Sequence, residues 1–125
     1  MDVVDATLQD FGKTLGIPSL QLNDKGLLEL AIDSVGTLFI EKTENLVTFY
    51  LIRPLSYPKL ETFKQALAFC HPKEKLESPV CAGMTRSDEL AFITHLSPAN
   101  FTIPNLETSI EVLKKLHNRI ANLVK

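Results

Sequence analysis

The residues best suited to chemistry are two cysteines and three histidines, namely Cys70, His71, Cys81, His95 and His117. Thiolate and imidazole groups are the usual ligands of zinc, and a cysteine beside a histidine can act as a nucleophile. Zinc ligands normally come in pairs two to four residues apart, and none of these five residues forms such a pair. The sequence therefore predicts no metal site.

Catalysis is equally poorly supported. Cys70 or Cys81 could pair with His95, but no glycine-rich elbow accompanies either cysteine. The adjacent carboxylates Asp88 and Glu89 stand in a predicted turn, where Asp is favoured for local hydrogen bonding. Neither of the glycine motifs that bind phosphate occurs in the chain. We therefore expect no enzymatic activity and no cofactor.

The composition is that of a single globular domain spanning residues 1–125. Hydrophobic residues make up 45% and charged residues 22% of the chain, and the formal net charge is −2. This charge argues against nucleic acid as a partner. No apolar run approaches the roughly twenty residues that span a bilayer, and Asp2 and Asp5 are unlike the basic start of a signal peptide. These features predict a cytoplasmic protein that does not enter membranes and keeps its two thiols reduced.

The elements that must position these residues begin with an amphipathic helix. Its apolar stripe, which we expect to face the core, consists of Val4, Leu8, Phe11 and Leu15. Gly16 should end this helix, and Pro18 cannot continue it.

Period-two patterns and turn residues then predict five strands. These cover residues 27–33, 37–41, 46–52, 80–85 and 90–96. The strand over 46–52 is apolar on both faces, so it should be covered on both sides by helices, a second subunit or a ligand.

Helical spacing predicts two further helices, over residues 60–70 and from Pro104 to the C-terminus. The stripe of the last helix is Leu106, Ile110, Leu113, Leu116, Ile120 and Leu123. The resulting order is α-β-β-β-α-β-β-α. Short turns make the strands of each hairpin antiparallel, so we predict an α+β fold with helices packed on a twisted antiparallel sheet.

The opening of the chain resembles a known family. The pattern Leu8-x-x-Phe11-x-x-x-Leu15-Gly16 is followed by Leu20-x-Leu22-Asn23-x-x-Gly26 and a strand. In this pattern, the element order, the length and the acidity, the chain is similar to the class I chaperones of bacterial type III secretion, the Tir-chaperone family.

This resemblance implies a function and two partners. The protein would be a homodimer in the bacterial cytoplasm that binds the N-terminal region of a secreted effector. It would use no ATP, and it would hold that region in an extended, export-competent form, with apolar side chains in grooves and some backbone pairing at a sheet edge.

Candidate effector contacts are the apolar positions left over once each strand has been given its better core face. They are Leu20, Leu22, Leu27, Phe39, Phe49 and Leu51. Val3, which lies off the apolar stripe of the first helix, could also line a groove. For Phe49 and Leu51, an ordinary place in the core is an equally good interpretation.

In the family, the second helix and the strand after it supply the dimer contact. The matching positions are Leu60, Phe63, Leu67, Val80, Ala82 and Met84. The alternative is that this helix packs only on its own sheet. Pro54 and Pro58 make a stiff link that could place the helix differently.

Two other functions fit the same pattern. The first is a housekeeping protein that binds a folded partner or stabilises a subunit. The second is an enzyme or ligand-binding domain with a pocket beneath the sheet, for which His95 and Cys81 would be the reactive groups.

Overall fold

The computed structural model describes residues 3–17, 20–55, 57–74 and 79–123. Its elements in chain order are α1 (Val3–Thr14), β1 (Leu27–Ile32), β2 (Gly36–Lys42), β3 (Val47–Pro54), α2 (Lys59–Phe69), β4 (Cys81–Met84), β5 (Glu89–Leu96) and α3 (Ile103–Leu123). Short 3₁₀ turns precede β4 and α3. The predicted α+β class and element order are confirmed, and the boundaries differ by one or two residues.

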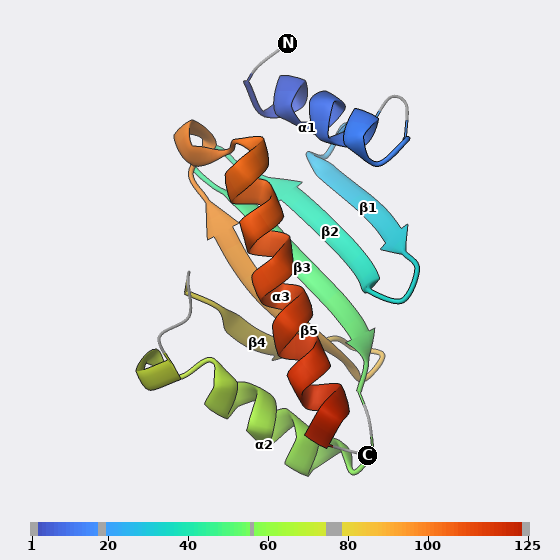
Figure 1. Ribbon diagram of the computed structural model, residues 1–125, viewed down its shortest axis with the longest axis vertical. Helices are drawn as coiled ribbons and strands as arrows, with labels where there is room; N and C mark the ends of the chain where they lie inside the picture. Colours follow the sequence, from blue (N-terminus) through green and yellow to red (C-terminus); the bar gives the residue numbers. More distant parts are fainter. Residues whose placement is uncertain (1–2, 18–19, 56, 75–78, 124–125) are drawn as a thin grey trace.

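The five strands form one antiparallel sheet in the order β1-β2-β3-β5-β4. The long helix α3 crosses one face of this sheet, while α1 lies at one end and α2 at the other (Figure 1). We call the face toward α3 the helix face and the opposite one the open face. Among the described residues, β1 and β4 each pair with one strand only, so they are the two edges.

The core lies between the helix face and the three helices. Alternate residues of the central strands are fully buried there, and α3 adds a buried stripe. The rings of Phe49 in β3 and Phe101 before α3 stack with their centroids 5.9 Å apart. Because successive strand side chains alternate between faces, burial of Phe49 and Leu51 directs Tyr50 and Ile52 to the open face.

Helix α1 ends one residue earlier than its predicted stripe. Val4, Leu8 and Phe11 are buried as expected, but Leu15 lies beyond the helix and is 45% exposed. Gly16 takes a φ of 74°, the left-handed conformation that ends helices and that glycine adopts most readily. The expectation that Leu15 belongs to the core is therefore wrong. At the other end of the chain Leu123, the last residue of the α3 stripe, is also exposed.

Helix α2 faces the core with two small side chains and one aromatic ring. Its buried residues are Thr62, Ala66 and Phe69. Leu60 and Leu67, which dominate the apolar stripe in the sequence, are 65% and 48% exposed. Thus α2 packs on its own fold through one side and leaves two leucine side chains on another.

Candidate functional site

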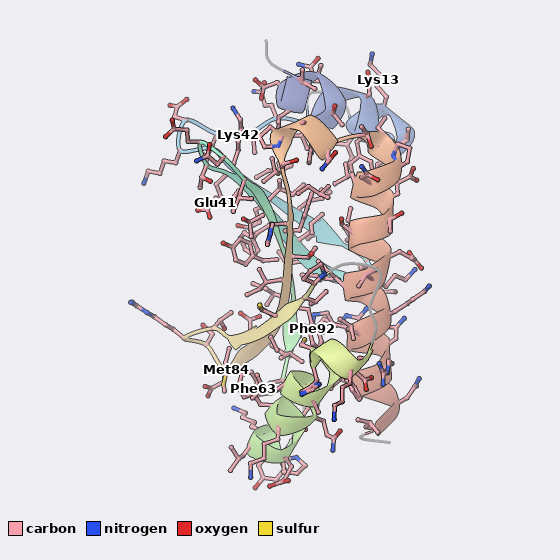
Figure 2. The ribbon with its side chains drawn as sticks, turned by 90° about the vertical axis from the view of Figure 1, so that its left-hand side faces the viewer. Lys13, Glu41, Lys42, Phe63, Met84 and Phe92 are labelled. Carbon is pink, nitrogen blue, oxygen red and sulfur yellow. The ribbon has the colours of Figure 1, made fainter. Side chains whose placement is uncertain are left out.

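The open face carries partly buried apolar side chains that none of the described helices covers. Figure 2 shows Phe92 on the side of the sheet toward α3 and Glu41 on the other side, and none of the helices that the structure describes lies over that second side. The strand register aligns Phe39, Tyr50 and Ile93 in one row across β2, β3 and β5. All three are partly buried. They form a continuous apolar strip flanked by polar groups.

A second row of small or branched side chains runs beside this strip. It consists of Ala31, Thr37, Ile52, Ala91 and Gly83 from all five strands. Because these side chains are shorter than the aromatic rings beside them, this row lies lower on the open face than the row of Phe39 and Tyr50. A surface with such a difference in height can accept apolar side chains from a partner.

Of the three side chains in this strip, that of Tyr50 alone carries a polar group, its hydroxyl. Its O–H group donates a hydrogen bond to Oε1 of Glu41 over 3.1 Å. Burial, and then the bond to Glu41 and its negative charge, raise the pKa of Tyr50 above its ordinary value. The hydroxyl therefore stays protonated and can hold the carboxylate in place.

The structure divides the predicted effector contacts between surface and core. Phe39 and Leu27 lie on the open face, as their register with Tyr50 and Glu41 requires. Leu20, Phe49 and Leu51 are buried instead. For Phe49 and Leu51 this is the core position that the sequence left open. The apolar β3 residues on the open face are Tyr50 and Ile52, which the pattern of the strand did not single out as contacts.

Val3 and Leu22 lie by two neighbouring cavities near the start of α1. Val3 is 68% exposed and lines a cavity of about 410 Å³ together with Pro98 and Ala99. Leu22 lines a more polar cavity of about 490 Å³. Both cavities border Lys42 and Glu44. These two cavities add candidate contact sites at the α1 end of the sheet.

A second apolar surface belongs to α2 and β4. Leu60 and Leu67 project from α2, Met84 at the end of β4 is 46% exposed, and Phe63 is half-buried between them and the core. Figure 2 shows Phe63 and Met84 close to each other. We call these four residues the α2 patch.

The other two predicted dimer residues lie closer to the core. Val80 is a core residue, and Ala82 packs against the core.

Two of the groups suited to chemistry become neighbours in the strand register. Cys81 and His95 are exposed diagonal neighbours on the open face. Burial, and to a smaller extent the nearby Cys81, raises the pKa of the Cys70 thiol to about 11, which makes it a poor nucleophile. The described residues contain no group of three side chains that could hold a metal ion.

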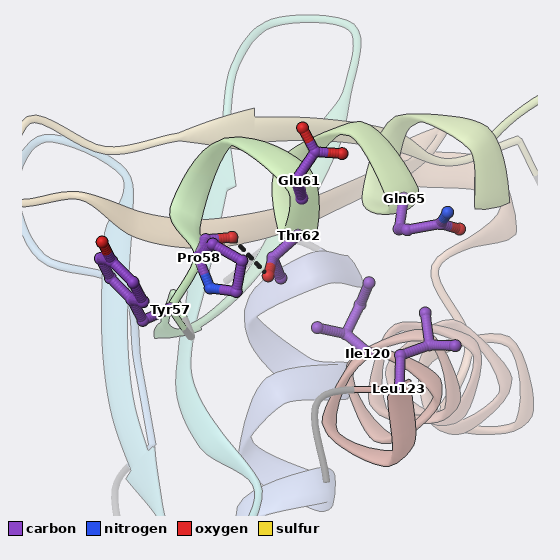
Figure 3. A pocket seen from close by; sticks show the side chains of 7 residues that line it. All are labelled: Tyr57, Pro58, Glu61, Thr62, Gln65, Ile120 and Leu123. Atoms are coloured by element: carbon purple, nitrogen blue, oxygen red, sulfur yellow. Dashed lines mark hydrogen bonds between the residues drawn. The ribbon is translucent and has the colours of Figure 1, made fainter.

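A further cavity of about 390 Å³ lies between α2 and the end of α3 (Figure 3). Its lining residues are Tyr57, Pro58, Glu61, Thr62, Gln65, Ile120 and Leu123. The hydroxyl of Thr62 donates to the carbonyl oxygen of Pro58 over 2.9 Å, and the backbone N–H of Thr62 donates to the same oxygen.

Within the described residues, no helix is long and apolar enough to cross a membrane.

Solved structures with the same fold include a chaperone-effector complex and other complexes of two proteins. The HopA1-SchA chaperone-effector complex matches with a TM-score of 0.71 at 16% identity, covering 93% of this chain and 91% of the other. The ExsC-ExsE complex matches with a TM-score of 0.73 at 17% identity, covering 88% and 84%. The ExoU-SpcU complex from the type III secretion system of Pseudomonas aeruginosa matches with a TM-score of 0.65 at 18% identity, covering 95% of each chain. At these identities the likeness shows the fold.

No curated protein sequence gives a significant match to the chain. The profile of one protein family does, and it covers residues 3–121, nearly the whole chain. This match agrees with the fold, with the open apolar face and with the resemblance seen in the sequence. The chain therefore belongs to the family described as type III secretory system chaperone SycN.

Proposed function

We propose that residues 1–125 act as a single-domain, non-catalytic and ATP-independent chaperone in the bacterial cytoplasm. It binds the N-terminal region of a type III secretion effector and keeps that region unfolded and ready for export. The observation that carries this proposal is the open face, where the row of Phe39, Tyr50 and Ile93 lies without a helix above it among the described residues.

The geometry suits a segment with little structure of its own. Such a segment has few internal contacts, so its affinity must come from many apolar anchors spread over a large surface. The open face offers these anchors in rows, and the edge strand β1 offers unpaired backbone groups for strand addition. The HopA1-SchA chaperone-effector complex, which has this fold, supports the same assignment.

The test uses N-terminal fragments of effectors encoded beside this gene. Replacing Ile52 and Ile93 by serine should weaken fragment binding by at least tenfold, because two apolar anchors are lost. Replacing Leu15 and Leu123 by serine is the matched control, since both are exposed apolar residues away from the open face.

The readouts are isothermal titration calorimetry and limited proteolysis of the bound fragment. A fragment that stays equally protected by the Ile52 and Ile93 variant would refute the open face as the binding surface. A compact fragment in the complex, seen by deuterium exchange, would favour the housekeeping partner-binding function instead.

We also propose that two copies pair through the α2 patch, continuous with the edge strand β4. Leu60, Leu67 and Met84 are exposed apolar residues on α2 and β4, two elements that contact each other. Exposed apolar side chains grouped in this way mark protein contacts. The flanking charges are of both signs, with Lys64 near Glu61 at 3.7 Å and Lys59 near Asp88 at 3.3 Å. A surface that carries both signs is compatible with pairing against itself.

Sedimentation equilibrium tests this pairing. The wild-type chain should sediment with twice the mass of one chain, and replacing Leu60 and Leu67 by serine should give the mass of one chain. The variant with serine at Leu15 and Leu123 should remain dimeric. A wild-type monomer at micromolar concentration would overturn the homodimer.

A further inference from the structure

The charged residues of the sheet are sorted by sign between its two faces. The strands, all of whose residues the structure describes, contain the acidic residues Glu29, Glu41 and Glu89 and the basic residues Lys42 and Arg53. The alternation of the strands places the three carboxylates on the open face and both cations on the helix face. The formal charges that the strands present on the open face are therefore all negative.

The contacts of Arg53 agree with this sorting. Its Nε–H group donates to the carbonyl oxygen of Val35, and its Nη1–H donates to Oδ1 of Asn118 in α3 over 3.0 Å. The guanidinium thus turns toward α3, away from the open face. It does not neutralise the carboxylates on the other side of the sheet.

Two of the carboxylates flank one aromatic ring. Glu29 in β1 is the direct cross-strand partner of Phe39 in β2, and Glu41 follows Phe39 by two residues on the same face. Glu29 and Glu41 are therefore diagonal neighbours, and such residues lie about 7–8 Å apart in antiparallel sheets. Like charges at this spacing repel each other, and a cation between them would relieve the repulsion.

Glu41 is held in a fixed position to receive such a cation. The Tyr50 hydroxyl donates to its Oε1 atom over 3.1 Å, and its second oxygen, Oε2, can accept another bond. The fixed carboxylate loses little conformational freedom when a partner binds. Tyr50 is thus a positioning residue for the acidic pair.

We propose that the effector segment bound to the open face carries a lysine or arginine among its apolar residues, and that this cation lies between Glu29 and Glu41 beside the ring of Phe39. The inference rests on the proposed effector binding and adds the chemistry of the partner to it. The apolar neighbours of the cation would contact the row of Tyr50 and Ile93, and the ring of Phe39 would attract the cation with its face.

The test uses two synthetic peptides of the same length and the same apolar pattern. One carries arginine at two central positions and the other carries glutamate there. We expect the arginine peptide to bind the wild-type dimer about tenfold more tightly than the glutamate peptide at low salt, and the difference to shrink as salt is added.

Charge reversal assigns this preference to the two carboxylates. The variant with Glu29→Lys and Glu41→Lys should invert the order of the two peptides. The matched control reverses Glu107 and Glu111, which are exposed on α3, and so changes the net charge equally. It should keep the wild-type order. In Tyr50→Phe, which keeps the ring, the preference for arginine should fall about two- to threefold because Glu41 is no longer held.

The outcomes separate this inference from the proposed function. If both peptides bind equally and shift the amide resonances of Phe39 and Ile93, the open face binds segments but the cation site is refuted. If both charge-reversed variants change the preference equally, the effect is one of net charge and the site is again refuted. If neither peptide nor any effector fragment shifts those resonances, the proposed binding face fails as well.

Discussion

The Nε2–H group of His117, in α3, donates a hydrogen bond to the backbone carbonyl oxygen of Leu51, in β3, over 2.6 Å. Because a carbonyl oxygen only accepts, this bond selects the tautomer with its proton on Nε2. The ring also meets Phe92 edge-on, with the centroids 4.8 Å apart and the planes at 76°. A buried, neutral histidine thus joins the long helix to the middle of the sheet.

This arrangement predicts a stability that depends on pH. Burial is the main reason why the pKa of His117 falls from 6.5 to about 4, with the charge of Arg53 acting in the same direction and the bond to Leu51 opposing it. Between pH 6.5 and 4, His117 binds a proton in the unfolded chain but stays neutral in the folded chain. The free energy of unfolding should therefore fall by up to about 1.4 kcal/mol per pH unit as the pH drops from 6.5 toward 4.

Urea unfolding at pH 7.5, 6, 5 and 4.5 measures this slope. His117→Gln should be less stable at pH 7.5 and should lose the slope assigned to His117. His95→Gln, at an exposed position of the open face, is the control and should keep that slope. Equal slopes in the wild type and His117→Gln would contradict the assignment.

The two faces of the central strands should respond differently to loss of an aromatic ring. Phe49→Ala removes a fully buried ring that stacks on Phe101, so it should lower the free energy of unfolding by about 3–5 kcal/mol. Phe39→Ala removes a partly exposed ring and should cost about 1 kcal/mol. Chemical denaturation gives both values. A reversed order would mean that the faces have been assigned wrongly.

Helix α2 should tolerate changes on its exposed side and reject them on its core side. Ala66 is fully buried, so Ala66→Leu should destabilise the chain by about 1–3 kcal/mol through overpacking. Lys64→Leu, on the exposed surface of the same helix, should change the stability by less than about 0.5 kcal/mol. Thermal unfolding of the two variants at equal concentration makes the comparison, and equal effects would argue against the packing of α2 described above.

Substitution by alanine should lower the free energy of unfolding by different amounts at two glycines with positive φ, Gly16 and Gly36. At Gly36, with a φ of 131°, an added Cβ would lie 2.7 Å from the carbonyl oxygen of Ile52. At Gly16, with a φ of 74°, nothing lies within 4 Å. Gly16→Ala should therefore cost about 1–2 kcal/mol from the backbone alone, and Gly36→Ala clearly more. Similar losses in urea titrations would show that the loop at Gly36 can move aside.

Much of the fold follows from local patterns. The stripe of Val4, Leu8 and Phe11 predicts α1, and the alternation around Leu38 and Ile40 predicts β2 with the correct inward face. Gly16 marks the end of α1 as expected. Each of these signals depends on neighbouring residues alone, so these elements can be predicted without knowledge of the tertiary contacts.

The faces of β3 and α2 could not be predicted in the same way. In β3, both alternating sets are apolar, so periodicity cannot tell Phe49 from Tyr50. The register decides, since the known inward face of β2 pairs Ile40 with Phe49. In α2, the large leucines suggest a core stripe, but the space beneath the helix fits Ala66 and Thr62. That space is set by residues far away in the chain.

The sorting of charge between the two faces also governs what the empty protein does. Exposed apolar faces of two protein molecules tend to stack on each other, and this association leads to aggregation. Here, two open faces brought together would press Glu29, Glu41 and Glu89 of one copy against the same carboxylates of the other. The repulsion between these carboxylates opposes self-association through the open face. The face of the unbound chaperone therefore stays accessible to a partner of opposite charge.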